Sequence, residues 1–93
     1  MNKEEFKAKA NQTIDEVAGK INELKAKKEA AVGDSKVKYE KALQDMESKK
    51  ADLQSKKADL ENASEEKWDE VKNAFSSATE DFKEGWKKLS SLF

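Results

Sequence analysis

The chain has 93 residues, of which 42% are charged and 35% are hydrophobic, and its formal net charge is −1. It contains no proline, cysteine or histidine, and all 19 of its basic residues are lysine. This composition excludes disulfides and metal sites built from cysteine or histidine, and without arginine or a basic excess it argues against nucleic-acid binding.

The first predicted element is an amphipathic helix over residues 2–31. Its apolar residues are spaced by 4, 4, 3, 4 and 3 positions, as in a heptad-like stripe and not as in a strand. They are Phe6, Ala10, Ile14, Val17, Ile21 and Leu24. Glu4 and Glu5 suit the first turn and Lys25, Lys27 and Lys28 the last, because these charges complement the helix dipole. Gly19 inside this helix costs up to about 1 kcal/mol relative to alanine.

Residues 33–35, with the sequence Gly-Asp-Ser, form the clearest predicted break. Gly33 can adopt the left-handed conformation that ends a helix, and Asp34 or Ser35 can cap the start of the next one. Because so short a connection favours antiparallel neighbours, the sequence predicts a helical hairpin.

A second helix, predicted over residues 36–62, contains an internal repeat. Residues 48–54 (SKKADLQ) and 55–61 (SKKADLE) are identical at six of seven positions. One heptad row of this helix is Tyr39, Met46, Leu53 and Leu60, and the companion row is Leu43, Lys50 and Lys57. Lysine in a heptad row weakens packing while restricting register and oligomeric state.

A third helix, predicted over residues 64–92, is strongly amphipathic. Its apolar face is Trp68, Val71, Phe75, Ala78, Phe82, Trp86, Leu89 and Phe93. Burying the five aromatic rings of this face would contribute roughly 20 kcal/mol as an upper bound. So large an apolar face must be covered, which makes it the candidate core or interaction surface of the protein.

The junction at residues 62–64 is compatible with a bend and with a continuous helix. Asn62 with Glu65 has capping-box character, but no glycine or proline enforces a stop. If the helix bends, its aromatic end can fold back as the third member of a small bundle. If it continues, it is ~85 Å long and its aromatic end needs a second subunit. A lipid surface is less favoured, because the face lacks the lysine excess that anionic bilayers attract.

The sequence predicts no enzyme activity, no cofactor and no metal site. Carboxylates are often adjacent, as in Glu65-Glu66, and adjacent side chains on a helix point about 100° apart instead of converging on one substrate. A glycine-rich phosphate loop and a nucleophile–base triad are both missing from the sequence. The many Lys/Glu patterns are more simply explained as solvated helix faces.

Four stretches of the sequence carry a family resemblance: residues 21–27 (INELKAK), 38–41 (KYEK), 68–72 (WDEVK) and 82–86 (FKEGW). With them the chain resembles, over nearly its whole length, small bacterial coiled-coil stress-response proteins first named from a cyanobacterial example. The resemblance implies a non-catalytic helical protein linked to stress, with no catalytic residues to transfer. Members often have a Gly-Asp break before the first tryptophan motif, where this chain has Ser64-Glu65-Glu66.

Together these patterns predict one all-α domain, an antiparallel helical hairpin or a three-helix coiled-coil bundle that self-associates as a homo-oligomer. The expected function is that of a non-catalytic structural or interaction protein, which binds itself, a protein client or a partner helix through its C-terminal aromatic face. The alternative is an amphipathic protein that coats lipid or storage-granule surfaces. A third and weaker option is a subunit or regulator of an enzyme. The N-terminus shows no secretory h-region, so a cytoplasmic location is expected.

Overall fold

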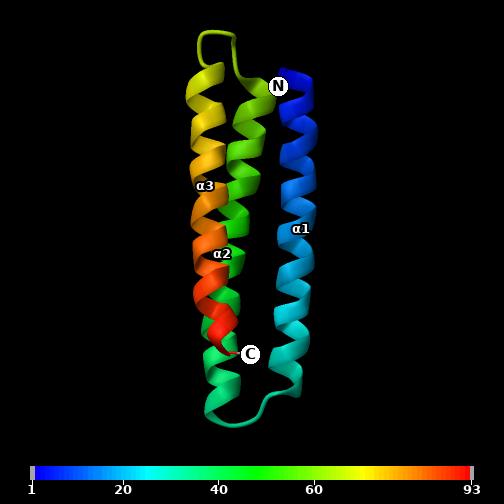
Figure 1. Ribbon diagram of the computed structural model, residues 1–93, viewed down its shortest axis with the longest axis vertical. Helices are drawn as coiled ribbons and strands as arrows, with labels where there is room; N and C mark the ends of the chain where they lie inside the picture. The colour runs from blue at the N-terminus through cyan, green and yellow to red at the C-terminus, as the bar shows by residue number, and fades with distance from the viewer. Residues whose placement is uncertain (1, 93) are drawn as a thin grey trace.

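The computed structural model describes the backbone of residues 2–92 and the side chains of residues 2–91. Three long helices run alternately up and down: α1 (Lys3–Ala30), α2 (Asp34–Asn62) and α3 (Trp68–Leu89), followed by a short 3-10 helix, η1 (Ser90–Leu92) (Figure 1). The molecule is a narrow rod of 51 × 18 × 17 Å. The prediction of an all-α three-helix bundle is confirmed.

Helix α1 begins at a side-chain cap and ends at a backbone hydrogen bond. The Oδ1 atom of Asn2 accepts a hydrogen bond from the backbone N–H of Glu5 (2.8 Å), which satisfies one of the free donors of the first turn. At the other end Ala31 is extended and its N–H donates to the carbonyl of Lys28. The helix is one residue shorter at each end than predicted, because Asn2 and Ala31 both leave helical geometry.

The turn between α1 and α2 corrects one detail of the sequence prediction. Gly33 has a positive φ of 62°, but with ψ at −136° it is not left-handed helical, and it occupies the N-cap of α2. Asp34 and Ser35 therefore do not cap the helix and instead form its first turn. The chain reverses at the glycine itself because only glycine reaches this backbone region without strain, so the next residue is free to be helical.

The junction between α2 and α3 is a break and not a continuation of the helix. Helix α2 ends at Asn62 and α3 begins at Trp68, four residues later than predicted, while residues 90–92 are 3-10 instead of α-helical. The predicted capping box at Asn62 is wrong. Its side-chain Nδ2 donates to the carbonyl of Ala58 (3.0 Å) and so closes the end of α2 instead of starting α3.

Helix α2 forms the centre of the bundle and packs closely against both α1 and α3. Its heptad row of Met46, Leu53 and Leu60 is at most 1% exposed. The core also contains the buried side chains Ala10, Val17, Ile21, Leu24, Ala42, Leu43, Phe75, Ala78 and Phe82. This row explains the repeat, because a leucine every seven residues keeps one face of α2 toward both neighbours.

The paired lysines of the repeat lie on either side of this buried row. Lys49 reaches the α2–α3 contact, where its side chain lies beside Gly85. Lys57 borders the contact between α1 and α2, beside Ile14 of α1. Both side chains are partly buried and both pair with a carboxylate of their own helix, Lys49 with Asp45 (3.8 Å) and Lys57 with Glu61 (3.8 Å). The apolar stems cover the seams while the charged ends remain in solvent.

Candidate interaction surface

The apolar face of α3 is turned into the bundle. Phe75, Ala78 and Phe82 are buried at its middle. The flanking residues are only partly buried against the core: Trp68, Val71, Trp86 and Leu89. The structure thus gathers seven of the eight predicted surface residues on one face, and the eighth, Phe93, lies outside the described residues. The face is buried at its centre and only partly buried on either side of it.

Phe6 of α1 completes an aromatic cluster at the start of α3. Its ring meets Trp68 edge-on, with centroids 5.9 Å apart at 83°, and meets Phe75 in the same way at 6.1 Å and 79°. Such edge-to-face pairs are favourable beyond the area that they bury. The sequence places Phe6 in the stripe of its own helix and gives no sign of its contact with the aromatic face. That link follows from the up-down-up topology, which places the starts of α1 and α3 at the same end of the rod.

Each tryptophan of α3 is also covered by a lysine from α1. The Nζ atom of Lys3 lies 5.5 Å from the centroid of Trp68, and that of Lys20 lies 5.0 Å from the centroid of Trp86. Trp86 in turn stacks on Phe82, with centroids 6.3 Å apart and planes inclined by 12°. These cation–π contacts use lysines that the sequence presented as ordinary solvated residues. They hold α1 and α3 together along a seam where few apolar side chains meet.

A surface groove of about 390 Å³ opens between α1 and α3. Its lining includes the apolar residues Phe6, Ala10 and Phe75. The hydroxyl-bearing residues Thr13, Ser76 and Thr79 also line it, together with the charged residues Lys9, Glu16, Glu80 and Lys83. The groove therefore combines apolar surface with charges of both signs, contributed by each of the two helices.

Gly85 has a packing role that the sequence analysis did not identify. A Cβ atom at this position would lie 2.9 Å from Cε of Met46 and 3.0 Å from Cε of Lys49. Hydrogen is therefore the only substituent that fits here without displacing the α2 side chains. The sequence signal was the placement of a glycine on the rim of an otherwise apolar heptad face, which is one mark of close helix approach.

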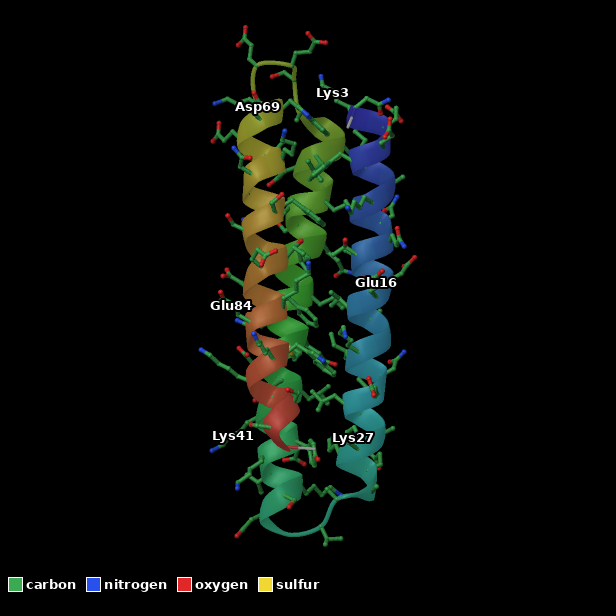
Figure 2. The ribbon with its side chains drawn as sticks, viewed as in Figure 1. Lys3, Glu16, Lys27, Lys41, Asp69 and Glu84 are labelled. Carbon is green, nitrogen blue, oxygen red and sulfur yellow. The ribbon has the colours of Figure 1, made fainter. Side chains whose placement is uncertain are left out.

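The charged residues lie mainly on the outside of the rod, where Figure 2 shows them projecting into solvent. The ion pairs are exposed or half-exposed; among them Lys3 with Glu65 (3.7 Å) and Lys25 with Glu47 (3.4 Å) join different parts of the chain. Among the described residues, no group of three or more acidic side chains is placed to hold a metal ion. Over the same part of the chain, none of the helices has the length and apolar character needed to cross a bilayer.

No family model matches the chain, and neither a curated protein nor a solved structure is significantly similar to it. The distinctive surface of the bundle is the seam formed by the aromatic face of α3 and the facing side of α1, which we call the α1–α3 seam.

Proposed function

We propose that this chain is a non-catalytic helical interaction protein that binds a partner through the aromatic face of α3. One observation carries the proposal: Trp68 and Trp86, which flank the middle of that face, remain partly exposed, while Phe75 and Phe82 between them are buried. Tryptophan is enriched among the residues that dominate protein–protein binding energy, because it offers a large apolar area with a polar N–H.

The character of the α1–α3 seam indicates what kind of partner it suits. The partly buried side chain of Phe6 lies in a groove with charges of both signs, for example Lys9 and Glu80. A partner of balanced charge with an apolar stripe, such as an amphipathic helix of another protein chain, matches this pattern. An anionic membrane or a nucleic acid would meet as much repulsion as attraction. A role under stress is supported by the resemblance to bacterial coiled-coil stress-response proteins.

The test compares two double variants of the full chain. Trp68→Ala/Trp86→Ala removes the partly exposed rings, whereas Asn73→Ala/Ser77→Ala changes two exposed positions of α3 without altering charge. Each is added to a heat-unfolded client enzyme, whose aggregation is followed by light scattering. We expect the wild type and the control variant to suppress aggregation, and the tryptophan variant to need at least about tenfold more protein because it lacks two anchor residues.

The same proteins are then sedimented with neutral and with anionic phospholipid vesicles. The proposal expects little co-sedimentation with either vesicle and a blue shift of tryptophan emission only when the client is present. Equal suppression by both double variants would contradict it. Strong vesicle binding that survives high salt would instead support the alternative function of coating lipid surfaces.

A further inference from the structure

We infer that a second copy of this chain can cover the aromatic face of α3, through an exchange of that helix between two molecules. In the exchanged dimer the 63–67 turn becomes helical, α2 and α3 form one continuous helix, and each α3 packs on the α1–α2 hairpin of the other chain. The inference rests on the proposed function, since it names one partner for the same face.

Residues 65–67 are already close to helical geometry, whereas Ala63, the first residue of the 63–67 turn, is extended, with φ −71° and ψ 135°. It contains neither glycine nor proline, and none of its residues has a positive φ. The N–H of Lys67 donates to the carbonyl of Ser64 (3.1 Å), and that of Trp68 donates to the carbonyl of Glu65 (3.4 Å), both in the i to i+3 pattern of a tight helical turn. Lys67 itself is in the right-handed helical region, with φ −95° and ψ −8°. Conversion to helix therefore concerns only a few residues at the start of the turn.

Little ties this turn to the rest of the bundle. Residues 64–67 are all exposed. The ion pair of Glu65 with Lys3 joins the turn to α1 at 3.7 Å, and the Glu65 side chain is 94% exposed. Exposed ion pairs contribute little to stability, so the loss of this ion pair when the turn opens costs little free energy. The contacts that do matter, such as Phe6 with Trp68, belong to the helices and would re-form between the two chains.

The apolar rows of α2 and α3 are in phase for a continuous helix. An 11-residue step joins Leu60 to Val71, and the same step joins Lys57 of the companion row to Trp68. Eleven residues make just over three whole turns, so both rows stay on one side of the joined helix. On either side of the junction the spacing returns to seven, from Leu53 to Leu60 and from Trp68 to Phe75. The exchanged helix would thus keep its apolar residues on one face, interrupted by the two lysines of the companion row, Lys50 and Lys57.

A single position distinguishes the closed turn from the continuous helix. Glu65 is the second residue of the turn closed by the Lys67–Ser64 hydrogen bond, where proline is favoured, and its N–H donates neither of the two bonds that hold the turn. In a continuous helix proline at 65 would remove a backbone hydrogen bond and clash with the preceding turn. Glu65→Pro should therefore leave the monomer folded and weaken the dimer. Glu65→Ala is the matched control, because it also removes the ion pair to Lys3 but favours helix.

The experiment measures the mass of the full chain and of both variants by sedimentation from micromolar to millimolar concentration, after heating and slow cooling. We expect the wild type and Glu65→Ala to form dimers, and Glu65→Pro to have a dimer dissociation constant at least about a hundredfold higher. Dimerisation of Glu65→Pro equal to that of the wild type would overturn the exchange while leaving self-association intact. A wild type that stays monomeric throughout would also overturn it, whatever the client assay shows.

Small-angle X-ray scattering provides a second measurement that does not depend on how well the proline variant folds. The closed monomer is 51 Å long. A continuous helix from residue 34 to residue 89 would be about 85 Å long at 1.5 Å per residue. We expect the wild-type dimer to be at least that long. A dimer no longer than the monomer would show side-by-side association and would overturn the inference.

Discussion

The apolar interior of this protein depends on a few large side chains. Most of the buried residues in α1 and α2 are aliphatic or alanine, whereas α3 supplies Phe75 and Phe82, which are 3% and 2% exposed. A narrow rod encloses few side chains, so each buried ring accounts for a large part of the apolar area that folding removes from water. Stability should accordingly be concentrated at these two positions.

Phe75→Ala and Phe82→Ala should each lower the free energy of unfolding by about 3–5 kcal/mol, because truncation both loses burial and leaves a cavity. The free energy of unfolding of a small domain is only about 5–15 kcal/mol, so the double variant should be largely unfolded at room temperature. Urea denaturation followed by circular dichroism measures this. Asn73→Ala/Ser77→Ala, at exposed positions of the same helix, should stay within about 0.5 kcal/mol of the wild type. A double phenylalanine variant with the wild-type melting temperature would contradict the packing described above.

At the scale of single elements, each helix ends where a local feature stops it, and the features differ. Asn2 caps α1, Gly33 reverses the chain before α2, and the end of α2 is closed by the amide of Asn62. The first two features are recognisable in a sequence, because side-chain caps and glycine turns have strong residue preferences. The third is not, since an asparagine can cap the helix before it or the helix after it.

Alanine substitutions at Gly19 and Gly33 test the backbone conformation of α1 and of the turn before α2. Gly19 is exposed in the middle of α1 and a Cβ atom there would meet nothing within 4 Å, so Gly19→Ala should stabilise the protein by up to about 1 kcal/mol. Gly33 has a φ of 62° and a ψ that other residues rarely adopt, so Gly33→Ala should destabilise it by about 1–3 kcal/mol. Chemical denaturation of the two variants under identical conditions provides the measurement. Changes of the same sign in both would show that one of the two backbone assignments is incorrect.

On the scale of the whole molecule, the two ends of the rod differ. At one end the ring of Phe6 meets that of Trp68, and all three helices are present. At the other, α3 stops short of the α1–α2 turn, as Figure 1 shows, and none of residues 25–41 is buried. Val32 there is 83% exposed. The hairpin tip is thus a two-helix structure on the end of a three-helix bundle.

Hydrogen exchange should reveal this difference. Amides of residues 36–40, at the start of α2, should exchange at least about tenfold faster than amides of residues 56–62, at its end, because opening the tip exposes almost no apolar surface. Both segments are terminal turns of the same helix, which makes the second a control for ordinary fraying. Mass spectrometry of peptides from the two segments suffices for the comparison. Equal protection would mean that another surface covers the tip in solution.

The heptad spacing of the sequence determined the helical class, the amphipathic faces and the first break, because these depend on local periodicity and on backbone preferences near one residue. The interior row of Met46, Leu53 and Leu60 could be read in the same way. Only the tertiary structure decided the second break, the place of Phe6 in the aromatic cluster and the close approach at Gly85. Each of these depends on residues distant in sequence that meet across α1, α2 and α3. At the 62–64 junction neither glycine nor proline enforces a stop, so the packing of the aromatic face decides between bend and helix.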